Sequence, residues 1–365
     1  MARRPLVAEA GSSGLAIPIF ILGIAPRSGT NYLHDLIRMH PQCEPQSSVL
    51  EEDFLIYNAR MLTRYAQTVS RSWKQKWGEQ ELEDEKQLLC AKIGEGLASF
   101  LYAQLARRKA AEETSPSRRL VTKTPHVENL ELFFELFPSA PLLILLRDGR
   151  SVVESTAKTF DRPYGYGARE WAAAAGKILD FKRRHPQAKY LIVKYEDLYQ
   201  NVKEELRRIF MFLGLDPESY DYAAAINAPV RGSCAVKTEE PSAHRDFWVA
   251  EGVTWNPTPK PTDFNPLARW HSWNRARHER FNWIAGPQMT ALGYPTRRYA
   301  GYQWWWSAWN VACDVLLADR ALWFWRRGVR RMNRIHNASE LFGTLREVSR
   351  KAWESLLFSR LQDSR

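Results

Sequence analysis

The sequence predicts an α/β fold in which a parallel β-sheet is flanked by helices. Two short, almost wholly apolar segments are typical of strands that are buried on both faces of such a sheet, and two further short segments are also predicted to be strands. Segments with helical periodicity alternate with them, and polar residues follow the strands directly. Ligands bind at the carboxyl ends of parallel strands, so these polar residues mark the predicted site. The predicted strands are IPIFILGIA (17–25), RRLVTKTP (118–125), APLLILLRDGR (140–150) and AKYLIVKYEDL (188–198).

The segments between the predicted strands carry apolar residues at helical spacing. TNYLHDLIRM (30–39) follows the first strand, SVVESTAKTF (151–160) follows the third, and NVKEELRRIFMFLGL (201–215) follows the fourth. Residues 51–110 alternate charged and apolar groups at helical periods, most clearly in ELEDEKQLLCAKI (81–93). The chain is therefore expected to alternate strands and helices over most of its length.

The sequence divides into three parts. A short basic leader (1–16) precedes the main domain (17–298), whose pattern is punctuated by Gly and Pro near its end. The remainder (299–365) is expected to form a helical, Trp/Arg-rich extension. Within it, the 302–334 segment packs six Trp and then five Arg into a short stretch. It fits either a basic amphipathic helix on a membrane or partner, or a helical pair packed on the domain with Arg stems over aromatic rings.

Composition narrows the classes of partner and compartment. The 365-residue chain has a net charge of +11 and a pI near 9.5, which favours an anionic partner or, alternatively, a basic surface that maintains solubility. No recognition motif accompanies the charge, so nucleic acid is not expected. The four cysteines are far apart, which predicts neither a zinc site nor a disulfide framework and favours a reducing, cytoplasmic location. No apolar run reaches the ~18 residues that span a bilayer.

The loop after the first strand, GIAPRSGTN (23–31), has the features of a phosphate cradle. It differs from the ATP-binding loop GxxxxGK[ST], because five residues separate its glycines and no Lys follows the second one. The basic residue, Arg27, stands before that glycine instead. The backbone amides of Ser28, Gly29, Thr30 and Asn31, at the start of a helix, are suited to surround a phosphate. The loop predicts phosphate binding without nucleoside-triphosphate chemistry.

Four segments, in order, carry a resemblance to a known family. PRSGTNYLHDLI (26–37) resembles the loop that binds the 5′-phosphosulfate of 3′-phosphoadenosine-5′-phosphosulfate (PAPS) in sulfotransferases, and LLRDGRSVVES (145–155) is similar to their 3′-phosphate motif. Residues 193–215 and 269–294 resemble the next strand-helix segment and the closing helices. The resemblance covers about 17–295 and is nearest the tyrosylprotein and bacterial branches. It implies a P-loop-like sulfotransferase fold, PAPS as co-substrate, 3′-phosphoadenosine-5′-phosphate (PAP) as product, and a displacement without a metal.

The resemblance assigns Arg147 and Ser155 to the 3′-phosphate. An Arg that leaves a buried strand, with a Ser two helical turns later, also fits a charge-assisted clamp on chemical grounds. The same Arg could instead form a structural salt bridge, for example to Asp148, and Arg150 could simply start the helix. The resemblance favours the clamp.

Further cofactor contacts are implied with less support from the residues alone. Arg231, Gly232 and Ser233 lie where the family has a loop over the 3′-phosphate, with a surface loop as the alternative. Tyr195 ends the fourth strand and matches a Tyr that touches the cofactor in the tyrosylprotein branch. That branch also has an Arg four residues beyond the Ser, and this chain departs from it with Thr159.

Sulfuryl transfer requires an aligned acceptor and neutralisation of the charge on the bridging oxygen. The resemblance places Arg27 against the 5′-phosphate. It also places Lys123, at the end of the second strand, near the transferring sulfonate, and the alternative for Lys123 is a solvated lysine.

The general base is open between two kinds of residue. The tyrosylprotein branch uses a Glu soon after the His-Pro that ends the first helix, and Glu51 and Glu52 follow 40–41 at a greater distance than that pattern, with Glu44 nearer. The cytosolic branch uses a His soon after the Lys, and His126 comes one place later. A carboxylate base needs its pKa raised by burial, whereas His titrates near neutrality. We favour Glu51 or Glu52 over His126, and capping or surface roles are the alternative for each.

The leading hypothesis is therefore a PAPS-dependent sulfotransferase that acts on a hydroxyl or amine of an unidentified acceptor, such as a carbohydrate, a lipid or another metabolite. One alternative is a P-loop kinase, which would need a lysine and a magnesium carboxylate that the sequence lacks. Another is a non-enzymatic basic protein that binds anions or membranes through residues 302–334. Residues 51–110, 237–264 and the tail are expected to line the acceptor pocket. The sequence indicates no oligomeric state.

Overall fold

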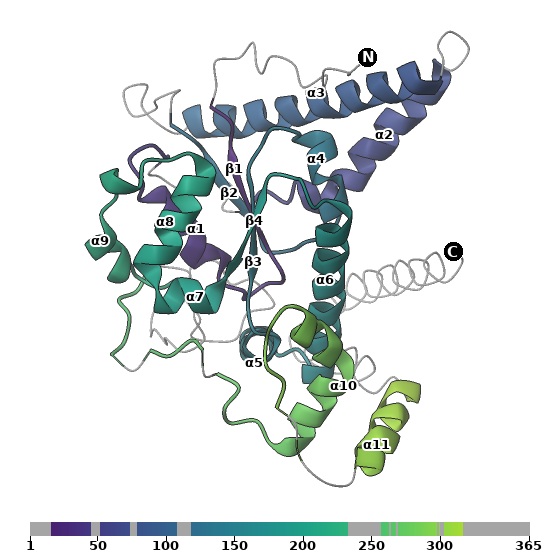
Figure 1. Cartoon of the computed structure of the whole chain (residues 1–365), viewed down its shortest axis with the longest axis vertical. Coiled ribbons are helices and arrows are strands. Elements are labelled where there is room, and N and C mark those ends of the chain that lie inside the picture. The colour runs from purple at the N-terminus through teal and green to yellow at the C-terminus, as the bar shows by residue number, and fades with distance from the viewer. Residues whose placement is uncertain are drawn as a thin grey trace, which may run out of the picture. The chain divides into compact units, whose positions relative to one another are not determined.

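The computed structural model describes residues 16–44, 52–73, 79–107, 118–232, 257–262, 264–267, 269–297, 299 and 303–316. Within these residues, a four-stranded parallel sheet has the strand order β2-β1-β3-β4 (Figure 1). The strands are β1 Ile19–Gly23, β2 Val121–Thr124, β3 Leu142–Leu146 and β4 Tyr190–Lys194. This confirms the predicted parallel α/β fold, with each strand shorter than the segment predicted for it.

The strands end level with one another. In the register, Leu22 pairs with Thr124 on one side and with Ile144 on the other, and Leu146 pairs with Lys194. The segments that follow the strands therefore leave the sheet at a common edge, as expected for parallel strands. In Figure 1, α5 (Gly149–Phe160) and α7 (Tyr195–Gln200) begin at this edge, below the strands.

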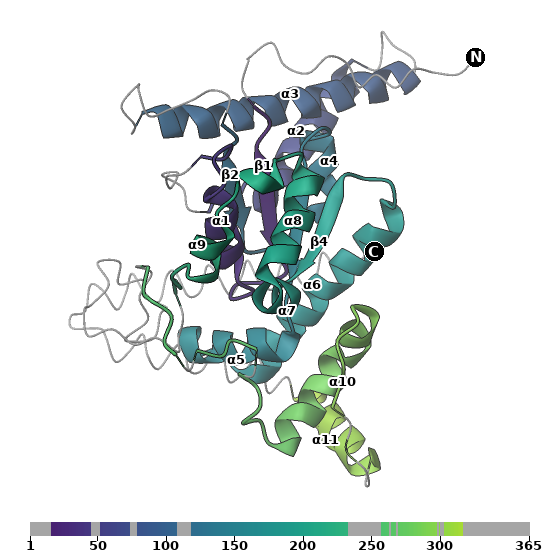
Figure 2. The same cartoon turned by 60° about the vertical axis from the view of Figure 1, so that its left-hand side comes forward.

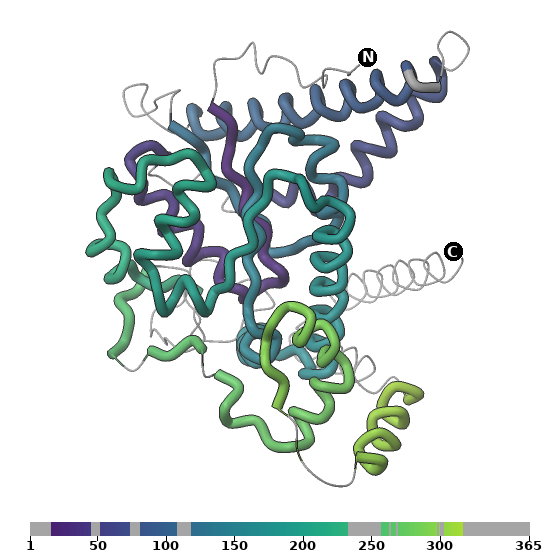
Figure 3. The backbone as a smooth tube through the Cα atoms, in the orientation of Figure 1, coloured from purple at the N-terminus to yellow at the C-terminus, as the bar shows by residue number. Residues whose placement is uncertain are grey.

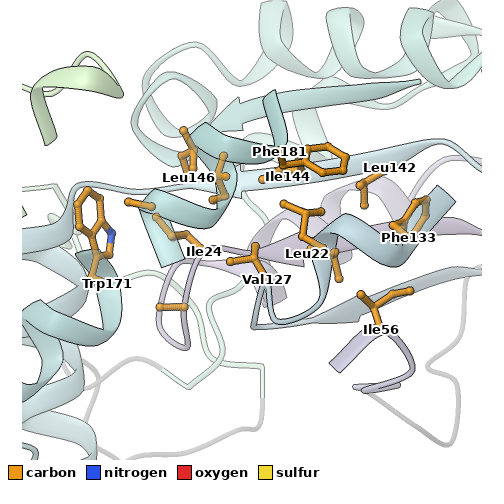
Figure 4. Packing of buried hydrophobic residues seen from close by; sticks show 14 of the residues in the cluster. Leu22, Ile24, Ile56, Val127, Phe133, Leu142, Ile144, Leu146, Trp171 and Phe181 are labelled. Carbon is orange, nitrogen blue, oxygen red and sulfur yellow. The ribbon is translucent and has the colours of Figure 1, made fainter. Parts of the chain in front are cut away.

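Helices cover both faces of the sheet, so the central strands are apolar in every position. Figure 1 shows α1 (Thr30–Arg38) and α8 (Val202–Leu213) on one face, and Figure 2 shows the same face turned toward the viewer. The other face packs against α4 (Phe133–Leu136), α5, α6 (Tyr164–Arg184) and α10 (Arg275–Ala291). Figure 4 shows Leu22, Ile144 and Trp171 within this second core. Burial on both faces explains why the strands lack polar alternation.

The predicted helices are confirmed, and residues 51–110 prove to hold two long ones, α2 (Ala59–Ser72) and α3 (Glu79–Ala106). The long helix α6 was not predicted from the sequence. The remaining elements are η1 Ile56–Asn58, η2 Leu130–Leu132, η3 Pro217–Ser219 and α9 Tyr222–Ile226. None of the described helices is long and apolar enough to cross a membrane.

The chain divides into two compact units, Met1–Tyr299 and Ala300–Arg365. The described part of the second unit is mainly α11 (Gln303–Val315), in which the rings of Trp304 and Trp305 stack at 4.9 Å. The predicted leader (except Ala16) and the five arginines between positions 326 and 334 lie outside the described residues.

The packing of α3 on α4 makes a testable difference between two glycines in one helix. A Cβ on Gly94 would lie 1.7 Å from the carbonyl oxygen of Leu136, whereas a Cβ on Gly96 would meet no atom within 4 Å. We expect Gly94→Ala to lower the free energy of unfolding by ~1–3 kcal/mol through overpacking. The matched Gly96→Ala should raise it by ~0.5–1 kcal/mol, because Ala restricts the unfolded chain. Urea unfolding of both variants tests the pair, and equal effects would contradict this packing.

Candidate functional site

The loop between β1 and α1 brings unsatisfied polar groups to the carboxyl edge of the sheet. It turns through two residues with positive φ, Arg27 at 73° and Gly29 at 99°. Gly29 is the N-cap of α1 and offers no side chain to the first amides of the helix. The Ser28 hydroxyl is buried and has no hydrogen-bond partner among the described residues. An amide-lined helix start with a buried, unpartnered hydroxyl is suited to an anion.

Tyr195 packs directly against this loop. A Cβ on Gly29 would lie 2.4 Å from the Tyr195 ring, so the close approach requires glycine as much as the backbone angle does. The guanidinium of Arg147 lies 4.1 Å from the centre of the same ring, on which it stacks. Tyr195, at the start of α7, thus contacts both predicted phosphate-binding elements.

This contact gives a second prediction, on Gly29→Ala. The left-handed backbone costs a non-glycine residue roughly 1–3 kcal/mol, and the added methyl group also displaces Tyr195. We expect a lower melting temperature and weaker binding of PAP, measured by thermal unfolding and calorimetric titration. Gly176→Ala is the matched control, because a Cβ at this position in α6 meets no atom within 4 Å. A Gly29→Ala protein that binds PAP like wild type would contradict the assignment of the loop.

Arg147 leaves the end of β3 and is buried, with 4% of its surface exposed. Its Nη1 donates to the carbonyl of Arg27 at 2.9 Å and its Nη2 to the carbonyl of Pro266 at 2.7 Å. Its Nε is buried without a partner among the described residues, and burial lowers the pKa of the guanidinium. None of the described carboxylates forms a salt bridge with it. The structural salt bridge considered from the sequence is therefore not the role of Arg147 within the described residues.

Asp148 pairs with Arg150 instead. The carboxylate of Asp148 accepts the backbone N–H of Arg150 at 2.8 Å and its Nε at 3.0 Å, which caps the start of α5. The Arg150 guanidinium also stacks on Trp270, 3.7 Å from the ring centre. Arg150 is therefore held at the helix start, which was the alternative considered for it.

Ser155, on α5, is a meeting point of cationic side chains. Its hydroxyl is buried and accepts from Nε of Arg27 at 3.2 Å and from Nη1 of Arg269 at 3.0 Å. Arg27 also donates to the carbonyl of Gly232. The structure thus brings Arg27, Arg147, Ser155 and Gly232 together. Arg269 was not identified as a site residue from the sequence, although it begins the segment 269–294 that resembles the closing helices of the family.

Arg231 lies beside this group but is engaged elsewhere. It forms a bidentate ion pair with Asp35 of α1, at 2.8 and 2.6 Å. Burial acts to raise the pKa of Asp35, but hydrogen bonds from His34 and Arg231 outweigh it and lower the pKa. The pair fastens the segment that carries Gly232 to the helix of the phosphate loop. Ser233 lies outside the described residues.

Lys123 and Glu52 meet at the end of β2. Nζ of Lys123, whose side chain is 1% exposed, donates to Oε1 of Glu52 at 3.2 Å. The neighbouring Asp53 accepts from the hydroxyls of Thr122 at 2.6 Å and Thr124 at 3.1 Å, and its own N–H donates to the carbonyl of Lys123 at 3.1 Å. These bonds place Glu52 beside Lys123. The role of Asp53 was missed from the sequence, although the TKT spacing offers two hydroxyls beside the lysine.

The other candidate bases are placed differently. His126 is half-buried against the rings of Phe54 and Tyr57, with centres 6.3 and 5.2 Å away. Burial, aided by the positive charge of Arg162, lowers the pKa of His126 to about 4. It is therefore a neutral and weakly basic imidazole near pH 7. Glu51 lies outside the described residues. The described residues contain no group of three His, Cys, Asp or Glu side chains placed to hold a metal ion.

Sequence comparisons relate this chain to one family of known proteins. A family model described as "Sulfotransferase family" matches residues 18–219. The chain is 27% identical over 207 residues to a protein-tyrosine sulfotransferase of Drosophila melanogaster, covering 54% of this chain and 38% of that protein. It is 26% identical over 208 residues to protein-tyrosine sulfotransferase A of Caenorhabditis elegans, covering 54% and 50%. The chain thus spans half or less of the length of these two relatives.

Solved sulfotransferase structures are also similar in outline. The sulfotransferase domain from the curacin biosynthetic pathway matches with 16% identity and a TM-score of 0.45, over 78% of this chain and 99% of that one. The match of the family model extends over more than half of the chain, from β1 through α8. The chain belongs to the sulfotransferase family.

Proposed function

We propose that this chain is a PAPS-dependent sulfotransferase that transfers a sulfuryl group to a hydroxyl or amine. The observation that carries the proposal is the buried Arg147 guanidinium beside the phosphate loop, with no carboxylate partner among the described residues. A buried cation without an ion-pair partner is costly, and an anionic ligand offsets that cost. The buried, unpartnered polar atoms of Ser28 and Arg147 fit the oxygens of a phosphorylated nucleotide.

The residues divide into two anion-binding groups. Ser28, Gly29, Thr30 and Asn31, at the start of α1, are assigned to the 5′-phosphosulfate. Arg147 and Ser155 are assigned to the 3′-phosphate, with Gly232 held beside them through Arg27. Tyr195 contacts both groups, because its ring packs against Gly29 and stacks with the guanidinium of Arg147.

PAPS, when bound, supplies the sulfuryl group and its leaving phosphate. Lys123 neutralises negative charge near the transferring group. Electrostatic stabilisation of this kind is usually the largest single contribution to catalysis. Glu52, held beside Lys123, accepts the proton of the attacking hydroxyl. Arg27, which is itself a residue of the phosphate loop, is assigned to the 5′-phosphate.

Incubation with PAPS carrying radioactive sulfur and a fractionated extract of the source cells tests this proposal. We expect label in one fraction, and excess PAP should suppress it. The extract is divided into lipid, glycan, small-molecule and protein fractions. Tyrosine-containing peptides are tested as a further acceptor, because the relatives are named protein-tyrosine sulfotransferases. Absence of label in every fraction, together with no PAP binding, would overturn the proposal.

We also propose that the 302–334 segment contacts an anionic membrane from the cytoplasm. The exposed apolar residues of α11 support this, since Trp304, Trp305 and Val315 are 65%, 60% and 75% exposed and five arginines follow in the sequence. We expect the wild-type protein to sediment with phosphatidylserine vesicles. The variant in which Trp304 and Trp305 are both changed to Ser should remain in the supernatant. Met211→Ser, an equally exposed apolar residue on α8, is the control. Unchanged sedimentation of the double variant would overturn the contact, and cell fractionation tests the location.

A further inference from the structure

We propose that a row of apolar side chains on η1 and α2 binds the acceptor, and that the acceptor is an alcohol whose hydroxyl is carried by an extended apolar chain. This apolar row consists of Phe54, Tyr57, Met61 and Tyr65. The inference rests on the proposed function and deepens it by naming a class of acceptor.

Three members of the apolar row are exposed although they are large. Tyr57, Met61 and Tyr65 are 42%, 74% and 60% exposed. Residues four positions apart share one side of a helix, so Met61 and Tyr65 are neighbours on α2, and Tyr57 precedes them by one turn. In Figure 3 the trace of α2 leads from the sheet to the outer end of α3. Single exposed apolar residues are common on proteins, whereas a continuous row is typical of a binding surface.

Phe54 attaches the apolar row to the end of β2. Its N–H donates to Oγ1 of Thr124 at 3.1 Å, and Thr124 directly follows Lys123 in the sequence. Its ring meets the ring of Tyr57 edge to face, with centres 6.0 Å apart. Glu52 stands two residues before Phe54 and accepts from Lys123. The apolar row therefore begins beside the pair of residues at which the sulfuryl group is proposed to be transferred.

The backbone of Phe54 is strained, and its surroundings hold it in place. Its φ of 50° is unfavourable for an aromatic residue. The carbonyl of Phe54 accepts from Nδ2 of Asn58 at 3.1 Å, and the carbonyl of Tyr57 accepts from Nδ2 of Asn129 at 2.8 Å. Such strain persists where neighbouring contacts impose it, and it is concentrated at functional sites. The two rings are thus positioned before an acceptor binds, which favours affinity.

The chemistry of the apolar row favours an apolar chain over a sugar. Met61 has no hydrogen-bond donor, and its flexible thioether adapts to irregular apolar shapes. The rings of Phe54 and Tyr57 lie at 90° to each other, so they share no flat face on which a sugar ring could stack. The eight residues from Tyr57 to Tyr65 rise by ~12 Å, which matches an extended chain of about ten carbon atoms. An alcohol with such a chain would place its hydroxyl near Glu52 and its tail along α2.

An apolar alcohol reacts with PAPS without any further co-substrate. The alcohol oxygen bonds to sulfur while the bond between sulfur and the bridging phosphate oxygen breaks, and the hydroxyl proton passes to Glu52. PAP leaves with the electron pair of the broken bond. The product is a sulfate monoester that carries a charged group at one end of its apolar chain.

Transfer of radioactive sulfur from PAPS to ethanol, 1-hexanol and 1-decanol tests the inference, with glucose as the polar acceptor. We expect kcat/KM to rise by roughly twofold to fourfold for each added carbon, the range for a methylene that is partly or fully removed from water. In the double variant Met61→Ser and Tyr65→Ser, the ratio of kcat/KM for 1-decanol to that for ethanol should fall by at least ~10-fold. Met211→Ser, at an apolar residue of α8 that is 72% exposed, is the matched control and should keep the wild-type ratio.

The outcomes separate this inference from its alternatives. A kcat/KM that does not change with chain length, or that is higher for glucose than for 1-decanol, would overturn it. The same gain with chain length in the double variant would overturn the apolar row as the subsite, provided that the melting temperatures match. Label in a glycan or peptide fraction with none in the three alcohols would overturn the inference and leave the proposed function intact. Absence of label in every fraction, with no PAP binding, would instead overturn the proposed function.

Discussion

Arg147→Ala is expected to weaken PAP binding by at least ~100-fold, because two or more charge-assisted hydrogen bonds to phosphate are lost. Transfer of radioactive sulfur should fall below detection in the same variant. The effect should exceed that of any other single change at this edge, since Arg147 also donates to the carbonyls of Arg27 and Pro266. Its loss thus disturbs the phosphate loop and the segment that leads to Arg269. Calorimetric titration with PAP is the measurement.

A control must separate lost binding from lost folding. Removing Arg147 leaves two carbonyls without their donor, which costs about 1–3 kcal/mol for each one that remains buried. Ser155→Ala serves as the milder companion, because it removes one acceptor and leaves both carbonyl contacts in place. We expect this variant to unfold at nearly the wild-type temperature and still to bind PAP more weakly. An Arg147→Ala protein that binds PAP with wild-type affinity would refute the clamp.

The strands and the phosphate loop were predictable from the sequence because local rules determine them. Strands buried on both faces must be apolar, so β1 and β3 are visible as continuous apolar runs. The loop was visible because its second glycine is required twice, by a positive φ and by the approach of Tyr195. The apolar strands and the positive φ are local features, whereas the approach of Tyr195 comes from a distant part of the chain.

The pairing of side chains in the site was not predictable in the same way. Arg27 bonds Ser155 across 128 positions, and Arg231 bonds Asp35 across 196. These contacts depend on how irregular segments cross the sheet edge, and such segments carry no periodicity. Glu52 and Lys123 were each proposed from the resemblance, but their ion pair depends on the bonds that Asp53 makes to β2. The local pattern identified the residues, and tertiary structure determined their partners.

Glu52→Gln is expected to lower the rate of sulfuryl transfer by ~10²–10⁴-fold, the usual contribution of a general base. The amide keeps an oxygen that can accept the hydrogen bond from Lys123, so the local geometry should persist, but it cannot take up a proton. PAP affinity should therefore remain at the wild-type value. The measurements are the initial rate of label transfer into the whole extract and a calorimetric titration with PAP.

The competing bases provide the contrast that makes this result decisive. His126→Asn should leave the rate close to wild type, because His126 contacts the rings of Phe54 and Tyr57 and its pKa of about 4 makes it a weak base. If His126 were the base, the rate would instead be lost in this variant.

Glu51→Gln completes the set, since Glu51 is the adjacent carboxylate. A large loss in Glu51→Gln with none in Glu52→Gln would move the role by one residue, and losses in neither would exclude a carboxylate base at this position. The ion pair with Lys123 favours Glu52, because a base beside the cation proposed to neutralise the transferring group would reach the acceptor where the new bond forms.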